Sequence, residues 1–237
     1  MKITCHMITS VDGKLLPSFW TPKFDGKDDL NAVYEAIADT FDADGIILGR
    51  KTMSEFPGIE EREPEQGPRT PQTNSYEAPE SRNCKIAVVF DETGKLHYQT
   101  NKLPSGEHIV AVLGSHVTRA YQKHLEDVGV SYVMRLPGNP EEETKDALRL
   151  IHKHFNSEHL LLEGGGKING SFFKHGLVDD LSVIIYPGLD GKSGRPSIIE
   201  CCEEAYEKPL EKNKLELQKC TAMKEGYVHL LYTVHRD

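Results

Sequence analysis

The segment Leu160–Gly176 combines the residue types that bind a phosphate group. It reads LLLEGGGKINGSFFKHG: an apolar run, the acid Glu163, three glycines and then a helical pattern. The glycines remove every Cβ from the turn, so backbone N–H groups can approach a bulky anion and a positive φ costs little. The following helix points its free N–H groups and its positive end at the same place. The pattern predicts a phosphate site, although a glycine-rich turn that binds nothing has the same sequence signature.

Two further groups of polar residues come directly after apolar runs. Ser10 and Asp12 stand at the end of the first run, where they would meet a ligand that lies across the edge of a sheet. Asp before Gly is also a common turn former. Arg50 and Thr52 follow the run GIILG, and an arginine fork beside a hydroxyl suits a nucleotide phosphate. A charged, exposed turn explains the same residues equally simply.

A loop over residues 15–25 carries Ser18 and the only tryptophan, Trp20. A tryptophan in such a loop is either a plug in the core or a flat wall for a ring ligand. The sequence lacks the motifs of three other enzyme classes: the G-x-S-x-G elbow of serine hydrolases, the H-E-x-x-H helix of zinc proteases and the P-C-x-x-C motif of zinc deaminases. We therefore expect no metal site.

Strands and helices alternate along the chain, and the polar groups above stand where strands end. Strands are predicted over 3–10, 45–49, 85–90, 108–113, 130–134, 160–162 and 181–186, and helices over 28–41, 117–125 and 141–155. This alternation is typical of an α/β fold with a mostly parallel sheet covered by helices. Residues 215–222 and 227–234 predict a C-terminal antiparallel hairpin. The polar segment from Glu60 to Arg82 is predicted to be a long surface loop that could close over a site.

Composition narrows the class of protein. We expect the 237 residues to form a single domain, 1–237, because no Gly/Ser- or Pro-rich linker divides them. The net charge of −9 argues against a nucleic-acid or anionic-membrane surface. Five cysteines without a C-x-x-C pair are typical of a reducing compartment. The sequence shows neither a signal peptide nor a membrane-spanning run, so we expect a cytoplasmic protein with no nucleic-acid and no membrane partner.

Four segments, in order along the chain, resemble the motifs of one family. Residues 9–14 (TSVDGK) resemble its S-x-D-G-K turn, 44–52 (DGIILGRKT) its DAILVGRGT strand and loop, and 88–96 (VVFDETGKL) its VVLDSxGRL. Residues 161–191 are similar, nearly residue for residue, to LVEGGGxLxxSFLxxGLVDELxLxIxPxLxG. The family is the RibD C-terminal domain family, the reductase domain of bifunctional riboflavin-biosynthesis deaminase-reductases. The resemblance spans almost the whole chain and implies a fold of the dihydrofolate-reductase type.

The resemblance implies hydride transfer from NADPH. NADH stays open, because Glu92 replaces a family serine near the 2′-phosphate, and a carboxylate there suits a free ribose hydroxyl. Glu163 and Ser18 fall where the family contacts its substrate, and Glu163, followed by Asp12, is our candidate for the catalytic group that supplies or steers a proton. Family members pair, so a homodimer is expected. The residues implied to bind the cofactor are Thr9, Trp20, Gly49, Arg50, Thr52, Gly164, Gly165, Gly166, Lys167, Ile168, Asn169 and Ser171.

Two arginines with which the family holds its substrate phosphate have no direct counterpart. Thr40 occupies one position and the segment 54–58 replaces the other, so only Arg62 or Arg69 could stand in. We predict a stand-alone NAD(P)H-dependent reductase of a small heterocyclic compound, for which the resemblance implies a phosphorylated ribosylaminouracil. The alternatives are a dihydrofolate-reductase-type pteridine reductase, which would place a buried acid on helix 28–41, and a nucleotide-binding sensor without turnover.

Overall fold

The computed structural model describes residues 1–24, 29–65, 67, 74–135, 138–201, 208 and 210–236. The chain forms two compact units. The central unit consists of Asp44–Leu160 together with Met1, and the terminal unit combines Lys2–Ala43 with Leu161–Asp237. Each unit is described by itself.

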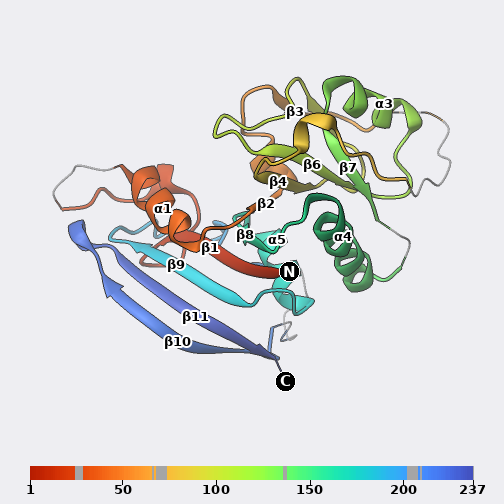
Figure 1. The fold of residues 1–237 in the computed structure, drawn as a ribbon. Coiled ribbons are helices and arrows are strands. Elements are labelled where there is room, and N and C mark those ends of the chain that lie inside the picture. Colours follow the sequence, from red (N-terminus) through yellow and green to blue (C-terminus); the bar gives the residue numbers. More distant parts are fainter. Residues whose placement is uncertain are drawn as a thin grey trace. The chain divides into compact units, whose positions relative to one another are not determined.

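The elements alternate as the sequence predicts (Figure 1). The terminal unit contains β1 Lys2–Ser10, η1 Pro17–Phe19, α1 Leu30–Ala38, η2 Asp39–Phe41, α5 Gly166–Lys174, β9 Asp180–Tyr186, β10 Asn213–Ala222, η4 Lys224–Gly226 and β11 Val228–Arg236. The central unit contains β2 Gly45–Gly49, α2 Arg50–Met53, β3 Ile59–Glu61, η3 Pro79–Ser81, β4 Ile86–Phe90, β5 Leu96–Tyr98, β6 His108–Leu113, α3 Arg119–Val128, β7 Ser131–Met134 and α4 Pro140–Phe155. Strand β8, His159–Leu162, has residues in both units.

Parallel strands in the order β2-β4-β6-β7 form the sheet of the central unit. Nearly every side chain of β4 and all those of β6 are buried, which explains why these strands are continuous apolar runs rather than alternating ones. The register pairs Gly49 with Phe90 and Phe90 with Val112. The carboxyl ends of the strands therefore lie at one edge, and the polar residues that follow them come together there.

The sheet of the terminal unit contains β1 and β9 in parallel, followed by β11 and β10 in antiparallel order. Ser10 at the end of β1 pairs with Tyr186 at the end of β9, so the turns after both strands are neighbours. The strands of the two units, which belong to one sheet, confirm the predicted α/β fold with a mostly parallel sheet and a C-terminal antiparallel hairpin.

Two short elements differ from the sequence prediction. Residues 50–53 form the helix α2 instead of a loop. Gly49 is the N-cap of this helix in an extended conformation (φ −77°, ψ 155°), and the helix begins at the next residue. Strand β3 pairs with β5 in a separate antiparallel sheet. The predicted loop from Glu60 to Arg82 therefore starts inside a strand, and Tyr76 exchanges two backbone hydrogen bonds of 2.9 Å with Tyr132. Residues 66 and 68–73 of that loop lie outside the described residues.

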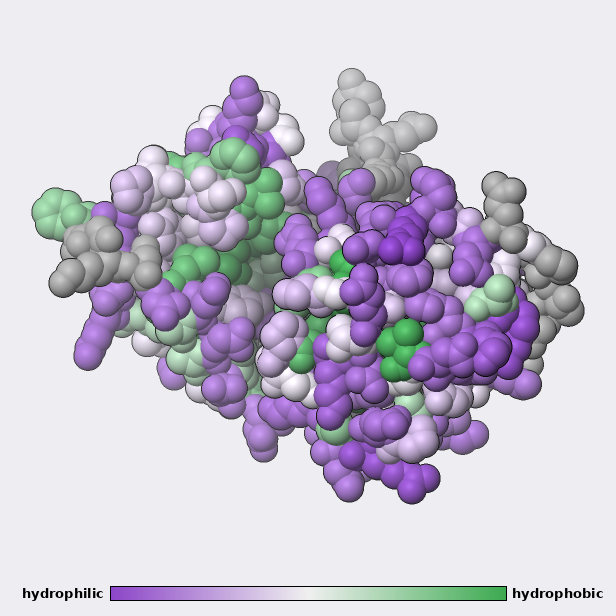
Figure 2. All heavy atoms as spheres, turned by 90° about the horizontal axis from the view of Figure 1, so that it is seen from above, coloured by the Kyte–Doolittle hydropathy of each residue, from purple (hydrophilic) through white to green (hydrophobic). Residues whose placement is uncertain are grey.

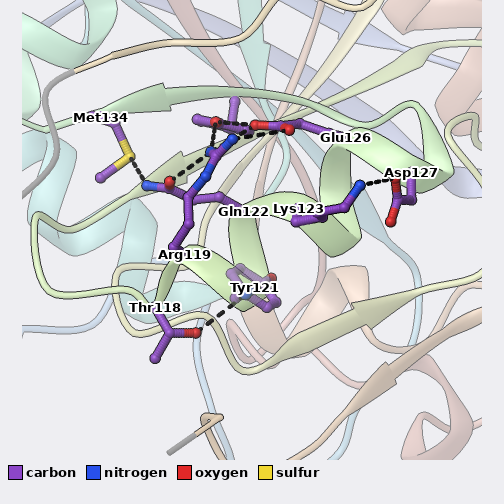
Figure 3. Close-up of polar contacts among 9 residues, drawn as sticks. Thr118, Arg119, Tyr121, Gln122, Lys123, Glu126, Asp127 and Met134 are labelled. Carbon is purple, nitrogen blue, oxygen red and sulfur yellow. Dashed lines mark hydrogen bonds and ion pairs between the residues drawn. The ribbon is translucent and has the colours of Figure 1, made fainter. Parts of the chain in front are cut away.

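Helix α3 is fixed to strand β7 by charged and polar side chains (Figure 3). Arg119 donates from both terminal nitrogens to the carboxylate of Glu126, over 2.8 and 3.2 Å, and Tyr132 of β7 donates to the same carboxylate over 2.9 Å. The hydroxyl of Thr118 caps the helix by accepting from the N–H of Tyr121. This network has a structural explanation and needs no ligand.

Replacing Asp91 by alanine is expected to lower the free energy of unfolding by about 3 kcal/mol, because buried donors lose a charged acceptor at about 1–3 kcal/mol each. The Asp91 carboxylate is fully buried and accepts from the N–H groups of Lys95 (2.9 Å) and Leu96 (2.8 Å) and from the hydroxyl of Tyr121 (3.1 Å). Urea unfolding measures the loss. The exposed Asp127, replaced by alanine in the same way, should cost under about 0.5 kcal/mol, and equal losses in the two variants would contradict the expectation.

On the face seen in Figure 2, hydrophilic residues predominate and hydrophobic residues show in smaller areas between them. The large exposed apolar side chains of the described residues include Leu215 and Leu217 on the edge strand β10. In the described part of the chain, the helices are all too short or too polar to cross a bilayer.

Candidate functional site

The turn after β1 is tied to the loop after β9 by the carboxylate of Asp12. Asp12 accepts hydrogen bonds from the hydroxyl of Ser10 (2.7 Å) and from the N–H groups of Asp190 (3.1 Å) and Gly191 (2.8 Å). These bonds, led by the one from Ser10, lower the pKa of Asp12 to about 2. The carboxylate is therefore ionised at neutral pH. This carboxylate holds the two turns together, and its predicted catalytic role stays a prediction.

Three predicted site residues lie close in sequence to this turn. The buried hydroxyl of Thr9 donates to the carbonyl oxygen of Lys14 over 3.1 Å, and the side chain of Ser18 is exposed. The Trp20 ring lies 5.1 Å from the ring of Tyr186, and its Nε1 is buried without a hydrogen-bond partner among the described residues. A buried donor without an acceptor costs about 1–3 kcal/mol. The indole N–H is thus available to an acceptor on a bound molecule.

Glu163 follows β8 and lies among buried weak acids of the terminal unit. Its side chain is hydrogen-bonded with the hydroxyl of Tyr34, which also donates to the carbonyl oxygen of His6 over 2.9 Å. Burial, and next the charge of Glu163, raise the pKa of Tyr34 well above its usual range, and the same two causes raise the pKa of Cys5. Tyr34 and Cys5 therefore keep their protons at neutral pH.

A buried polar chain lies behind Tyr34. The ring nitrogen Nδ1 of His6 is 2.9 Å from the hydroxyl oxygen of Ser182, which is 2.8 Å from Nε2 of His229. The His6 ring stacks on the ring of Tyr34 at a centroid distance of 4.3 Å. Burial lowers the pKa of His6 to about 4, although the backbone hydrogen bond to Tyr34 partly opposes this. His6 is therefore neutral over the physiological range.

Acid is expected to weaken the fold through His6. The pKa of His6 is about 4 in the folded protein and about 6.5 in an unfolded chain, so between these values only the unfolded state binds the proton. Stability is therefore complete above pH ~6.5 and falls as the pH drops toward 4. Urea unfolding at pH ~7.5 and ~4.5 measures the loss, which should be smaller by about 2 kcal/mol in His6→Asn. An equal loss in both proteins would contradict this assignment.

The glycine turn leads into α5 as predicted, but two reasons given for its glycines need correction. Gly164, Gly165 and Gly166 all lack a positive φ, so backbone strain does not explain them. A Cβ on Gly166 would lie 2.3 Å from the carbonyl oxygen of Ser197, a contact with the protein's own backbone. The third glycine therefore allows close packing. Gly165 starts the helix without a side-chain cap, which leaves the first turn of α5 suited to an anion.

The segment Pro196–Cys201, called the strap below, packs on both parts of the predicted site in this unit. Leu15 donates its N–H to Pro196 over 2.9 Å, and Glu200 donates its N–H to Gly166 over 2.9 Å. The strap thus connects the turn after β1 with the start of α5. This connection could not be read from the sequence, because the first hydrogen bond joins residues 181 positions apart and the second joins residues 34 positions apart.

The remaining residues of the α5 turn differ in exposure. Asn169 is fully buried; its side-chain N–H donates to Ile198 of the strap over 2.8 Å, while its Oδ1 has no partner among the described residues. Lys167 is exposed, and Ile168 and Ser171 are half-buried. The amide of Asn169 therefore holds the strap through its nitrogen. Its contact with a cofactor, like those of the other three, stays a prediction.

In the central unit, Arg50 and Thr52 lie on α2, directly after β2. Arg50 forms an ion pair with Glu61 of β3: its Nε is 2.9 Å from Oε1, at an angle that does not make a hydrogen bond. Both side chains are about 40% exposed (39% and 41%). The cation expected to hold a phosphate is therefore already partly neutralised by a carboxylate.

A cavity of about 350 Å³ lies in the central unit at the ends of β4, β6 and β7. The sequence singled out one lining residue, Glu92, and missed Arg135 and Glu143. Arg135 directly follows β7 and Glu143 lies in the first turn of α4, so only the sheet order brings them to Glu92. The signal that could have found them is the rule that side chains after adjacent parallel strands share one edge. The lining residues are Pro64, Glu92, Thr93, Gly114, Ser115, His116, Arg135 and Glu143.

Solved structures similar to the whole chain show the same fold. A pyrimidine reductase-like protein from Corynebacterium diphtheriae matches with a TM-score of 0.65 at 18% identity, covering 100% of this chain and 92% of that one. The riboflavin biosynthesis reductase of Saccharomyces cerevisiae matches with a TM-score of 0.59 at 13% identity, over 98% and 89%. RibD of Acinetobacter baumannii matches at 0.63 and 16%, and this chain spans only 57% of its length. The common fold is of the dihydrofolate-reductase type.

The family model described as the RibD C-terminal domain matches residues 1–229, nearly the full length of the chain. The match includes the turn after β1, the end of β2, Glu163 and the glycine turn. This chain belongs to the RibD C-terminal domain family.

Proposed function

We propose that this protein is a reductase that transfers hydride from a nicotinamide dinucleotide to a small heterocyclic substrate. The observation that carries the proposal is the position of Glu163 in the terminal unit. Its carboxyl is hydrogen-bonded with the buried hydroxyl of Tyr34, and only two glycines separate it from the uncapped start of α5. A carboxyl group beside an uncapped helix start suits the reduction of a polar substrate by a phosphate-bearing cofactor.

The described residues fit such a cofactor in two respects. The N-terminal turn of α5 has no side-chain cap, and the buried Nε1 of Trp20 has no protein acceptor within the described residues. When bound, the cofactor supplies the hydride, and the protein orients it and excludes water. The residues proposed to hold it are Thr9, Trp20, Gly164, Gly165 and Lys167 of the terminal unit. The contacts implied for Gly49, Arg50 and Thr52 of the central unit stay predictions.

The substrate proposed from the family is pyrimidine-like, and its phosphate contacts would differ from those of the family. Thr40 lies in η2, where its hydroxyl donates to Ile37 over 2.6 Å. Arg62 pairs with Glu60 over 2.8 Å, and Arg69 lies outside the described residues. Each missing charge-assisted bond to a phosphate would weaken binding by about 1.5–3 kcal/mol. We therefore propose a heterocycle without a phosphate, recognised through Ser18 and Glu163.

A pteridine reductase receives less support. A pteridine reductase would place a buried acid on the first helix. Asp29, at the N-terminus of α1, is instead exposed and accepts a hydrogen bond from the N–H of Ala32. Glu35 and Asp39 are exposed as well, and Asp28 lies outside the described residues. The described part of this helix thus offers a pterin no buried carboxylate.

Titration of Trp20 fluorescence with NADH and NADPH tests the proposal, together with the oxidation of each in the presence of pyrimidine, pteridine and carbonyl compounds. We expect quenching by at least one dinucleotide and turnover with a heterocycle. Failure of both dinucleotides to bind at millimolar concentration would overturn the proposal. Tight binding without turnover on any substrate would support a sensor instead. Light scattering of the same preparation tests the predicted homodimer.

A further inference from the structure

The loop after β9 contains an arginine that is mostly buried and donates no hydrogen bond to the described residues. The side chain of Arg195 is only 24% exposed. Its Nε is buried without a hydrogen-bond partner, and its two terminal nitrogens reach solvent without donating to any described group. A guanidinium carries five N–H donors in a fixed fork, and desolvating such donors without acceptors is costly. Arg195 therefore has donors to offer to a bound molecule.

Two neighbours fix the orientation of this guanidinium. Its central carbon, Cζ, lies 3.2 Å from the centre of the Phe19 ring, so the aromatic ring covers one face. Its Nε lies 3.3 Å from Oδ1 of Asp190, whose side chain is 1% exposed. Because one face lies on Phe19 and the Nε side lies against Asp190, the edge left for a ligand is the one with the two terminal nitrogens.

The guanidinium lies beside a residue that is predicted to contact the substrate. Phe19 directly follows Ser18 in η1, and the side chain of Ser18 is exposed. Asp190 donates its N–H to the carboxylate of Asp12 over 3.1 Å, which fixes the loop of Arg195 to the turn after β1. Arg195, Ser18 and this turn therefore lie together in the terminal unit.

The backbone of the two turns leaves room for a ligand. Gly13, Gly191 and Gly194 have φ angles of +77°, +71° and +74°, and a Cβ added to any of them would have no atom within 4 Å. The positive φ explains why these residues are glycines. The empty space means that no described segment packs on them. Both turns are therefore accessible to a small molecule.

The two turns are positively charged, although the whole chain carries a net charge of −9. Lys14, Lys192 and Arg195 supply three positive charges and Asp12 and Asp190 two negative ones, so the turns are positive by one charge. Both carboxylates already have donors: Asp12 accepts from Ser10 and two backbone N–H groups, and Asp190 accepts the N–H of Lys192 over 3.0 Å. The local charge thus favours an anionic group.

A carboxylate fits this guanidinium better than a phosphate does. Two parallel N–H groups of an arginine match the two oxygens of a planar carboxylate. A phosphate monoester carries a charge of about −1.5 to −2 at pH 7 and would meet the carboxylates of Asp190 and Asp12 with that larger charge. Since Asp190 already offsets part of the charge of Arg195, a singly charged group is the better match.

We propose that the terminal nitrogens of Arg195 bind a carboxylate of the substrate, while Phe19 and Asp190 hold the guanidinium in place. The inference rests on the proposed function and adds to it the chemical class of the substrate: a heterocycle that carries a carboxylate. Arg195 is the specificity-determining residue. Phe19 and Asp190 are positioning residues, because they act through the guanidinium.

Calorimetric titration of the full chain with orotate and with uracil tests the inference, because orotate is uracil with a carboxylate on the ring. Each titration is done with and without a saturating dinucleotide. We expect orotate to bind at least about tenfold more tightly than uracil. Equal affinity, or no binding of orotate at millimolar concentration, would overturn the inference. Fluorescence titration of the same preparation with dinucleotides decides the proposed function separately.

Competition separates a carboxylate site from a phosphate site. Inorganic phosphate at the same concentration should leave most of the orotate bound. Displacement of orotate by phosphate would mean that the guanidinium prefers the larger charge, and the carboxylate assignment would be wrong.

Variants locate the contact. Arg195→Gln should remove the preference for orotate, and Arg195→Lys should keep only part of it, because lysine lacks the fork. Asp190→Asn should raise orotate affinity several-fold, since it removes a negative charge beside the guanidinium while its Oδ1 can still accept the N–H of Lys192. An arginine with a purely structural role would give no such gain.

The matched control is Lys192→Gln, which removes an exposed cation from the same loop. It should change the preference for orotate by less than about twofold, because solvent and salt screen an exposed charge. Equal effects of Lys192→Gln and Arg195→Gln would assign the preference to the general charge of the loop and overturn the role of Arg195. If Arg195→Gln loses its native circular dichroism, Asp190→Asn decides: without a gain in orotate affinity, the inference fails.

Discussion

Replacing Glu163 by glutamine is expected to lower kcat by a factor of about 10²–10⁴, the usual contribution of a general acid or base. The amide keeps the size and one oxygen of the carboxyl but cannot exchange a proton. Dinucleotide affinity should change less than about threefold, because the first turn of α5 and the glycines before it are unaltered. Single-turnover kinetics and calorimetric titration of the same variant separate the two quantities.

The comparison with two other variants sharpens this expectation. Tyr34→Phe removes the hydroxyl that is hydrogen-bonded with Glu163, and it should shift the pH profile of kcat while lowering its maximum only about tenfold or less. Glu158→Gln serves as the matched control, because Glu158 is an exposed glutamate before β8. A Glu163→Gln variant that keeps full turnover would leave the protonation step to water or to another residue. Loss of dinucleotide binding in that variant would assign Glu163 to the cofactor instead.

Strands of the central sheet could be predicted from the sequence almost to the residue. The predicted strands 45–49 and 108–113 coincide with β2 and β6, because strands buried on both faces must be short, unbroken apolar runs. The three-residue strands β3 and β5 gave no such signal. Their side chains are buried at Ile59 and Tyr98, but three residues are too few to display a period.

The candidate site could be predicted only where its residues are neighbours in sequence. Glu163 and the glycine turn form one segment, and the turn after β1 forms another. The sequence did not predict three contacts. The strap is hydrogen-bonded to both segments, Asp12 accepts hydrogen bonds from the loop after β9, and Arg135 pairs with Glu92 and Glu143. Each of these depends on contacts between distant segments, and local residue patterns carry no information about them.

Replacing Gly170 by alanine is expected to lower the free energy of unfolding by about 3 kcal/mol, at the upper end of the usual cost of overpacking. Its Cβ would lie 2.0 Å from the carbonyl oxygen and 2.5 Å from the carbonyl carbon of Glu200. These are backbone atoms of the strap, so no flexible side chain can move aside. Gly166→Ala meets the carbonyl oxygen of Ser197 at 2.3 Å and should behave alike.

The matched control is Gly138→Ala, where the nearest atom, Oε2 of Glu142, is 3.6 Å from the new Cβ. Thermal unfolding of the three variants gives the ranking, and cofactor titration shows whether binding follows stability. If the glycines of α5 serve the strap, Gly170→Ala loses stability and affinity together, since the displaced strap no longer holds the turn after β1. A stable Gly170→Ala variant with weakened dinucleotide binding would instead mean that this glycine faces the ligand, and the packing explanation would be wrong.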